Sequence, residues 1–407
     1  MPHAILKMLC RPKGLLKFMI LPNLTDIHQG LCPGQIAFKK ALLRNFKQVT
    51  FLGVFASLSP MSQIEKKTAK FLIIRFSSFG DVVQTLSIPS ALAAQFPGAE
   101  THWITRKDMA PLLSGHPHVQ KVWSFDKKTG LSGLIKMCFE MRQEHFTHIY
   151  DAHNNLRSRV ICFILRPLGL FGMGPKFIRR SIRRWKRFLL FRFRVNTFEM
   201  PFSGQRDLLE PLQAWGVSKL APPAPQIFPS AENRAKALAI LGDYGNTVAL
   251  APSAAFFLKR WPKEYWKELI LKLPQQKFVL LGGPEDAFIE DIRDVAPDRV
   301  LNLAGKCSLQ VSSAVIQESR VLISGDTGLM HVAEQLGKPT IALMGPAPFG
   351  FPSRPTTKIL EIELPCRPCS KHGQGPCINK YKYHQCLVDI TPDEVALRLQ
   401  TILGQDL

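Results

Sequence analysis

The sequence lacks the features that mark three common classes of protein. It has no run of about 18 apolar residues, which a membrane-spanning helix would need; the apolar segment 160–170 is short and is interrupted by Arg166 and Pro167. It has no GxxxxGK[ST] motif, which argues against a P-loop nucleotidase. No GxGxxG follows the first predicted strand, which argues against a dinucleotide oxidoreductase.

Acidic residues are also scarce. The chain has 31 Asp and Glu against 53 Lys and Arg, a net charge of +22 over 407 residues. An excess of this size favours anionic partners, such as nucleic acid, a phosphorylated substrate or an anionic membrane surface.

Residues 1–66 form a basic segment without a clear structural period. The first fifty residues carry eight Lys and Arg and one acid, Asp26. Lys and Arg interrupt the early apolar stretches, so a secretory signal is not predicted. A disordered extension and a membrane-surface arm are both compatible with this composition. We favour a third interpretation, sequence upstream of the true start, because the polar segment from Met61 runs directly into the first convincing strand.

From residue 67 onward, short apolar runs alternate with helical patterns, which is typical of doubly wound parallel sheets. A proline-rich segment at 221–229 divides this region. We therefore predict an α/β fold with an N-terminal domain at 67–220 and a C-terminal domain at 221–390. A capping box beginning at Thr391 opens a final helix within 391–407, which we expect to brace the N-terminal domain.

The most informative stretch is Arg320–Pro346, which reads as strand, tight turn, helix and strand. Its Gly-rich turn aims backbone N–H groups and a helix N-terminus at whatever lies above the sheet, and phosphate is the usual occupant. Asp326 and His331 lie at the same edge. A turn whose Asp only caps the helix is an equally good interpretation of this stretch alone.

Other turns are predicted to reach the same edges of the two sheets. Asp81 begins a helix directly after a glycine, where it is either a dipole-stabilised acid or a general base. Lys259 and Arg260 precede another helix, where they either form a solvated basic loop or clamp phosphate. Two such edges facing across a cleft would suit transfer from an anionic activated donor.

Six motifs in order resemble glycosyltransferase family 9, the heptosyltransferases of lipopolysaccharide inner-core assembly. The resemblance covers about residues 68–404, in FLIIRFSSFGDVVQTLSIPSAL (71–92), YDAHNNLRSR (150–159), LKRWPKEYW (258–266), FVLLGGPED (278–286), LISGDTGLMHVAEQLGKPTIALMGP (322–346) and CLVDITPDEV (386–395). It implies a GT-B fold, two Rossmann-like domains facing across a cleft. It also implies an inverting, metal-independent transfer of heptose from ADP-heptose to lipid A-core oligosaccharide, by a cytoplasmic protein peripheral to the inner membrane.

The resemblance also implies roles for individual residues. Asp81 would deprotonate the acceptor hydroxyl. Lys259 would contact the donor phosphates and sugar, and Asp326 would hold the sugar. Thr327 and Gly328 would present backbone N–H groups to the diphosphate.

Further donor contacts are implied at Glu285, which would bind the adenosine ribose, at Cys307, in the base-contacting position, and at His331, which would support the diphosphate site. The chain departs from the family at the positions just before Lys259, where family members often carry hydroxyl residues. Only Ser253 has a hydroxyl there, followed by Ala254, Ala255, Phe256 and Phe257.

The segment 176–194 holds nine Lys and Arg, no acid and several aromatic residues. A solvated helix face, a membrane or glycolipid surface and nucleic acid are all compatible with it. Because the segment lies in the predicted acceptor domain, we favour anionic lipid A-core and the anionic inner-membrane surface, and expect no nucleic acid. The predicted acceptor and membrane residues are Asn154, Arg157, Arg179, Arg180, Arg183, Arg184, Lys186 and Arg187.

The C-terminal cysteines Cys366, Cys369, Cys377 and Cys386 form a cluster whose spacing matches no established zinc finger. Free thiols are favoured over a structural zinc, and any metal would be structural because the family's transfer requires none; no cofactor is required. A rival hypothesis is a catalytically inactive GT-B-like module that binds anionic glycolipid or nucleic acid. The intact Asp81, Lys259 and Asp326 argue against it, whereas the Ala254–Ala255 departure argues weakly for it.

Overall fold

A computed structural model describes residues 68–404 of the chain. The predicted basic segment 1–66 lies outside these residues, as do Lys67 and 405–407. No helix in the described range combines the length and the apolar character needed to cross a membrane.

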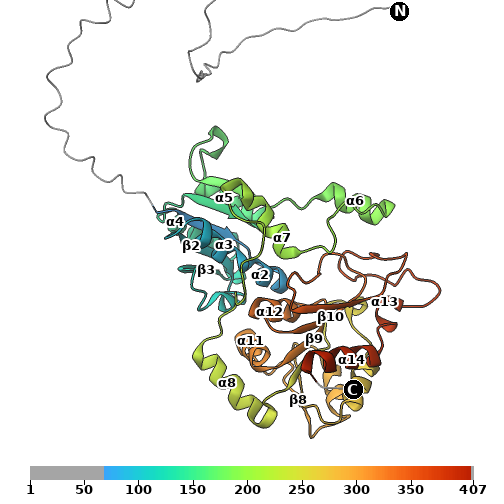
Figure 1. Cartoon of the computed structure of the whole chain (residues 1–407). Helices are drawn as coiled ribbons and strands as arrows, with labels where there is room; N and C mark the ends of the chain where they lie inside the picture. The colour runs from blue at the N-terminus through green and yellow to red at the C-terminus, as the bar shows by residue number, and fades with distance from the viewer. Residues whose placement is uncertain (1–67, 405–407) are drawn as a thin grey trace, which may run out of the picture. The chain divides into compact units, whose positions relative to one another are not determined.

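The N-lobe, residues 70–215, is built on a five-stranded parallel sheet in the order β3-β2-β1-β4-β5. Its central strand β1 is an apolar run, and the sheet lies between helices (Figure 1). The strands are β1 Lys70–Ile74, β2 Glu100–Arg106, β3 Lys121–Phe125, β4 His148–Asp151 and β5 Lys176–Arg179. The helices are α2 Phe79–Thr85, α3 Ser87–Gln95, η1 Ala110–Leu113, η2 Lys127–Thr129, α4 Gly130–Arg142, α5 Leu156–Leu165, η3 Gly169–Phe171, α6 Arg184–Phe193, α7 Gly204–Leu209 and η4 Glu210–Trp215.

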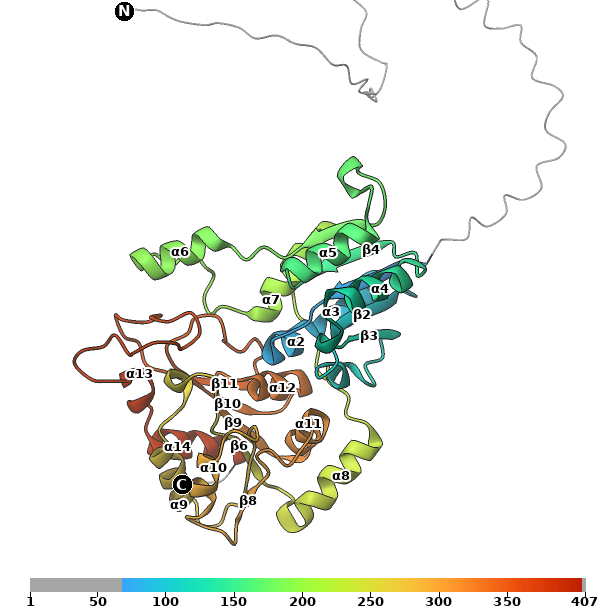
Figure 2. The same cartoon turned by 180° about the vertical axis from the view of Figure 1, so that it is seen from behind.

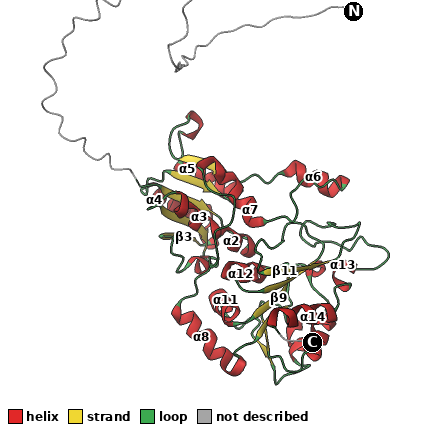
Figure 3. Ribbon diagram, in the orientation of Figure 1, coloured by secondary structure: helices red, strands yellow, loops and turns green. Residues whose placement is uncertain are grey.

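The C-lobe, residues 231–403, repeats this plan with a six-stranded parallel sheet in the order β11-β10-β9-β6-β7-β8 (Figures 2 and 3). The strands are β6 Val248–Ala251, β7 Phe278–Leu280, β8 Val300–Asn302, β9 Val321–Gly325, β10 Thr340–Met344 and β11 Thr357–Glu361. The helices are α8 Ala231–Leu241, η5 Gly242–Tyr244, η6 Phe257–Lys259, α9 Lys263–Lys272, α10 Phe288–Arg293, α11 Leu309–Glu318, α12 Gly328–Leu336, α13 Gln385–Val388 and α14 Pro392–Leu403. Two parallel sheets flanked by helices confirm the predicted α/β architecture.

The last helix differs from the expectation. Thr391 caps α14 by accepting a hydrogen bond from the Glu394 N–H, as the capping box predicts. The helix then packs on α9 and β10 of the C-lobe, with Val395 and Leu399 fully buried in the same apolar cluster as Trp266. The apolar stripe of α14 is thus satisfied within its own lobe, so the expectation that this helix braces the N-terminal domain is corrected.

The two lobes meet through α2 and α12, which lie side by side in both views (Figures 1 and 2). The approach is close because both helices carry glycine at the contact: a Cβ on Gly328 would lie 2.1 Å from the Phe79 ring. Polar contacts add to it, since the Gln335 side chain donates to Val83 O (2.9 Å) and to Ser87 Oγ (3.1 Å). The lobes are therefore joined at the base of the space between the two sheets.

Candidate functional site

A cleft of about 1480 Å³ lies between the carboxyl ends of the two sheets. In an open α/β sheet this is the edge where ligands bind. The structure brings every predicted catalytic and donor residue to this cleft: Asp81, Ser253, Lys259, Glu285, Cys307, Asp326, Thr327, Gly328 and His331.

Asp81 lies on the N-lobe wall, in the first turn of α2. Its side chain is 40% exposed and forms an ion pair with the buried Arg75, 2.6 Å from Nη2 to Oδ2. The Ser78 hydroxyl and N–H also donate to Oδ2, at 2.8 and 3.3 Å. All three interactions end on the same oxygen, so none of them uses Oδ1.

These contacts keep Asp81 ionised. Burial alone would raise the pKa of Asp81, but the charges of Arg75 and Arg180 and the two hydrogen bonds from Ser78 outweigh it and lower this pKa to about 2. Arg75 is held in turn by a hydrogen bond from Nη1 to Ala152 O, 2.6 Å long. The N-lobe therefore presents a fixed carboxylate to the cleft.

The opposite wall is cationic at its surface. Lys259, in η6, forms an ion pair of 2.5 Å with Asp326, which lies just after β9. Thr327 caps α12, and its Oγ1 shares a hydrogen bond of 2.9 Å with Ser324. The free N–H groups at the start of α12 and the Lys259 ammonium are thus arranged around one region, which suits a diphosphate.

Other donor-side residues lie around the same wall. Glu285 is exposed above Gly283, and Cys307 and Ser253 are half-buried in the cleft lining. Within the departure at 254–257, Ala254 is buried and its carbonyl accepts a hydrogen bond of 2.9 Å from Arg260 Nε.

His331 is the most enclosed of the predicted residues. It is buried in α12, where Nδ1 lies 2.9 Å from Glu334 Oε2 and Nε2 lies 2.9 Å from the Gln84 amide of the N-lobe. Glu334 is fully buried and also accepts hydrogen bonds from the N–H groups of Ser353 and Arg354. His331 therefore joins the two lobes at the base of the cleft as well as bordering the diphosphate region.

The predicted basic acceptor residues divide into two groups. Arg180 and Arg187 line the cleft, whereas Asn154, Arg157, Arg179, Arg183, Arg184 and Lys186 do not. Three of the arginines are neutralised by acids of the same lobe, in the pairs Arg179–Asp151, Arg180–Asp207 and Arg183–Glu210. The Asn154 amide donates to Arg180 O, which orders the backbone beside the cleft. These three arginines of the basic segment are therefore structural, whereas Arg184 of the same segment and Arg157 outside it are exposed.

Sequence reasoning missed two parts of the cleft. Arg75 was not singled out, although a charged residue that directly follows a buried apolar strand has to find a buried partner. Lys371, His372 and Gln374 also line the cleft. They lie in an irregular loop, so no sequence period indicates where their side chains point.

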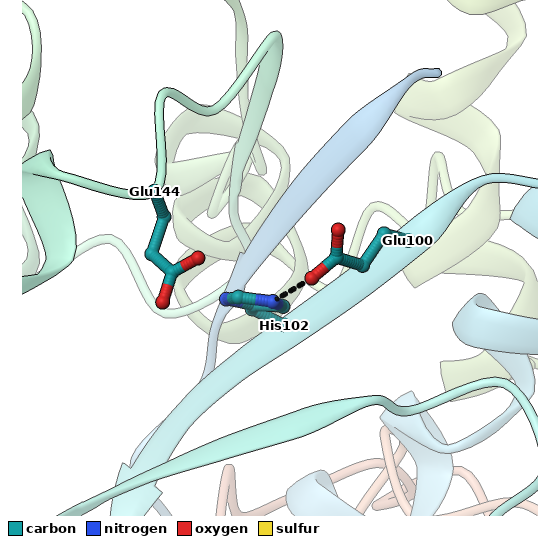
Figure 4. A group of neighbouring side chains, drawn as sticks. All are labelled: Glu100, His102 and Glu144. Carbon is teal, nitrogen blue, oxygen red and sulfur yellow. Dashed lines mark hydrogen bonds and ion pairs between the residues drawn. The ribbon is translucent and has the colours of Figure 1, made fainter.

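A second cluster of titratable groups lies away from the cleft, at the amino ends of β1 and β2. Glu100, His102 and Glu144 bring three ligand atoms within 4.8 Å of one another (Figure 4). Lys70 pairs with both carboxylates, at 3.1 and 2.9 Å, and Lys121 pairs with Glu144 at 2.6 Å. Hydrogen bonds from Lys121 and Lys70 lower the pKa of Glu144 to about 2. These lysines already supply the positive charge that a metal would bring, so we assign this cluster a structural role.

Comparison with known proteins identifies the family of the chain. Residues 135–380 match the model of glycosyltransferase family 9 (heptosyltransferase). Lipooligosaccharide heptosyltransferase 2 of Haemophilus ducreyi is 28% identical over 361 residues, covering 82% of this chain and 99% of that protein.

Solved structures share the fold. A family 9 glycosyl transferase from Veillonella parvula superposes with a TM-score of 0.67 at 20% identity, covering 83% of this chain and 97% of that one. E. coli ADP-heptose lipopolysaccharide heptosyltransferase II superposes with a TM-score of 0.61 at 22% identity, covering 82% and 98%. The two-sheet architecture is thus that of GT-B heptosyltransferases, and the chain belongs to glycosyltransferase family 9, the heptosyltransferase family.

Proposed function

We propose that this protein is an inverting, metal-independent glycosyltransferase that transfers heptose from ADP-heptose to the inner core of lipopolysaccharide. One observation carries the proposal: the Asp81 carboxylate on one lobe and the Lys259–Asp326 pair with the start of α12 on the other line the same cleft. Relatives named as lipooligosaccharide and ADP-heptose heptosyltransferases support the donor and acceptor classes.

The proposed reaction is a single displacement. The acceptor hydroxyl attacks the anomeric carbon of the heptose while the bond from that carbon to the diphosphate oxygen breaks, and the electron pair leaves with ADP. Asp81 accepts the hydroxyl proton through Oδ1. Lys259 and the N–H groups at Thr327 and Gly328 stabilise the charge that develops on the departing diphosphate. Because the nucleophile and the leaving group lie on opposite lobes, attack from the far face inverts the anomeric carbon.

Arg75 has a specific place in this mechanism. A carboxylate whose pKa is about 2 is a weak base toward a free alcohol. The attacking hydroxyl becomes acidic only as its oxygen bonds to the anomeric carbon, so proton transfer accompanies bond formation. Arg75 keeps Asp81 ionised and fixes its orientation until that moment.

The acceptor suggests where the protein works. A lipid-linked core oligosaccharide lies at the membrane surface, and α6 exposes Trp185, Phe188 and Phe193 beside arginines such as Arg184. Aromatic and cationic side chains together favour an anionic lipid interface. We therefore propose a cytoplasmic protein that is peripheral to the inner membrane, with α6 as a contact surface.

The test is turnover of ADP-heptose with a heptose-deficient core acceptor. We expect Asp81→Asn to lose roughly 10²–10⁴-fold in kcat, the usual contribution of a general base, while ADP affinity changes less than about twofold because Asp81 faces the acceptor side. Asp126→Asn, at the cap of η2, is the matched control and should keep wild-type turnover. Equal rates for Asp81→Asn and wild type would reject Asp81 as the base. No turnover by the wild type would favour a catalytically inactive binding module.

A further inference from the structure

Four cysteines of the C-lobe surround one small cavity. Cys366, Cys369, Cys377 and Cys386 all line a space of about 10 Å³, which is close to the volume of a single probe sphere. Each of the four is a free thiol. The other described cysteines lie elsewhere: Cys138 and Cys162 are in the N-lobe core, and Cys307 is in the cleft.

The groups around this cavity suit a bound cation. The His384 N–H points at Cys377 Sγ, 3.3 Å away, as backbone amides do toward metal-bound thiolates. Arg367 also lines the cavity, and its guanidinium is fixed by Gly345 O at 2.9 Å and by Glu361 at 2.9 Å. Four thiolates around a divalent ion carry a net charge of 2−, and the Arg367 charge, which is shared with Glu361, offsets it only in small part.

The sulfurs are spaced around the cavity more widely than a shared ion would hold them. No three of them lie within 4.8 Å of one another, whereas tetrahedral ligation with bonds of about 2.3 Å places sulfurs about 3.8 Å apart. Binding would therefore draw the two ends of the loop together, the CxxC end at 366–369 and the end at 377–386.

The loop between these cysteines reaches the cleft. No helix or strand lies between Glu361, at the end of β11, and Gln385, at the start of α13. The tip of this cysteine loop (residues 366–386) places Lys371, His372 and Gln374 in the cleft lining. Its backbone is close to the donor side, since a Cβ on Gly373 would lie 2.8 Å from Lys259 Cγ.

The departure from the family pattern at 256–257 fits this loop. The Phe256 ring lies 6.3 Å from the His372 ring, and the Phe257 ring stacks on His384 at 5.8 Å. Two aromatic residues thus occupy the positions where hydroxyl residues often stand, and both contact the cysteine loop.

We propose that Cys366, Cys369, Cys377 and Cys386 hold one thiophilic metal ion, zinc or iron, and that this ion anchors the cysteine loop over the donor side of the cleft. Tetrahedral tetrathiolate coordination suits both metals. The metal site does not depend on the proposed function, whereas its effect on the donor does. The ion takes no part in the transfer and lies behind the wall that Lys259 forms.

The first experiment measures metal content. The full chain is purified under anaerobic conditions without chelator, and zinc and iron are measured by plasma mass spectrometry. We expect about one ion per chain in the wild type, less than about 0.2 in Cys369→Ser/Cys377→Ser, and an unchanged content in Cys138→Ala, the control at a buried thiol outside the loop. Circular dichroism of each variant separates loss of the ion from loss of the fold.

Two results would overturn the metal site. One is a wild-type chain with less than about 0.2 zinc and iron together. The other is a disulfide between loop cysteines in the non-reduced peptide map of the anaerobic protein. If circular dichroism shows that the double variant has not folded, wild type treated with phenanthroline and then reloaded with zinc or iron provides the same comparison within one folded chain.

The second experiment tests the anchoring by calorimetric titration with ADP. We expect the metal-depleted chain to bind ADP about tenfold more weakly and to recover when the ion is restored. Lys371→Ala should retain the ion but bind ADP several-fold more weakly. Equal ADP affinity with and without the ion would overturn the anchoring role. Failure of the loaded wild type to bind ADP would reject the proposed donor and leave the metal result intact.

Discussion

The two lobes each carry an aspartate at a strand–helix corner facing the cleft, and each aspartate is paired with one cation. In the N-lobe, Asp81 is 40% exposed and its partner Arg75 is 6% exposed. In the C-lobe, Asp326 is 7% exposed and its partner Lys259 is 16% exposed. The same ion pair is thus turned in opposite directions, with the acid outward on one lobe and inward on the other.

This difference explains how one fold plan supports two roles. An outward carboxylate held by a buried cation can accept a proton but repels phosphate. An outward ammonium held by a buried carboxylate, beside the N-terminus of α12, attracts phosphate. The cleft is therefore polarised from the N-lobe to the C-lobe, as transfer from an anionic donor to a neutral hydroxyl requires.

Among substitutions that change both kcat and ADP binding, the largest effect is expected from Lys259→Met. Loss of the ammonium should lower kcat about 10²–10³-fold, since it removes stabilisation of the departing diphosphate, and should weaken ADP binding at least tenfold. Asp81→Asn should lower kcat alone, so steady-state kinetics and calorimetry distinguish the two corners.

The free energy of unfolding distinguishes a functional effect of Lys259→Met from a loss of folding stability. Lys259→Met leaves Asp326 buried without its partner, at a cost of roughly 3–5 kcal/mol in the free energy of unfolding. The double variant Lys259→Met/Asp326→Asn should recover most of this stability in denaturant unfolding while ADP binding stays weak. Recovery of ADP binding in the double variant would show that Lys259 acts only on the fold.

A smaller effect is expected from Arg75→Met, and it appears in the pH profile. In the wild type the pKa of Asp81 is about 2, so Asp81 stays ionised throughout the usual assay range. Its stabilising effect is present above its unfolded pKa of about 3.9 and is lost as the pH falls toward 2. Without Arg75 the pKa of Asp81 should rise, because burial raises it and only Arg180 and Ser78 remain to lower it, so an acidic limb in kcat/KM should move upward by at least about one pH unit.

Ser78→Ala is a milder substitution whose pH profile can be compared with that of Arg75→Met. It removes the hydroxyl hydrogen bond of 2.8 Å to Asp81 but keeps the Arg75 charge. We expect a shift of the acidic limb in the same direction but smaller than that of Arg75→Met. Superimposable pH profiles for the wild type and Arg75→Met would mean that Arg75 does not control the ionisation of Asp81.

The contact between the lobes predicts a smaller loss. Gly328→Ala places a Cβ 2.1 Å from the Phe79 ring, and such overpacking costs about 1–3 kcal/mol. The melting temperature should fall, and KM for ADP-heptose should rise a few-fold because the cleft is wedged open. Gly80→Ala, whose Cβ would lie 3.3 Å from the His331 ring, should cost less. If the double variant Phe79→Ala/Gly328→Ala has a melting temperature no higher than that of Gly328→Ala, the clash with the Phe79 ring is not the cause of the lost stability.

How far the sequence predicts this fold depends on where each strand lies in its sheet. The central strands β1, β6, β9 and β10 are buried on both faces and stand out as apolar runs. Strands β5, β8 and β11 do not stand out in this way, and each forms an edge of its sheet. Edge strands are only partly buried, so their sequences carry no continuous apolar run.

The same distinction applies to the cleft. The residues at strand–helix corners, such as Asp81 and Asp326, were predictable because a turn after a buried strand has a known position relative to the sheet. The pairing of Asp81 with Arg75 was not, because it requires the side-chain direction of Arg75, directly after β1. The entry of Lys371 into the cleft depends on the path of an irregular loop, which local propensity does not specify.

The smallest effect is expected at the surface of α6, where the N-lobe extends beyond its sheet (Figure 1). One face of α6 packs inward through Leu190 in a cluster with Phe349 of the C-lobe, whereas Trp185 and Phe188 stack on each other and are exposed. Trp185→Ser/Phe188→Ser should therefore leave the fold intact.

Binding of this double variant to phosphatidylglycerol vesicles in a sedimentation assay should weaken about fivefold, since interfacial aromatic side chains contribute on the order of 1 kcal/mol. Leu397→Ser, an exposed apolar residue on α14, is the matched control and should bind as the wild type does. If the wild type binds phosphatidylglycerol and phosphatidylcholine vesicles equally well, α6 is not a surface that recognises anionic membranes. Recognition of the acceptor would then depend on the polarity of the cleft.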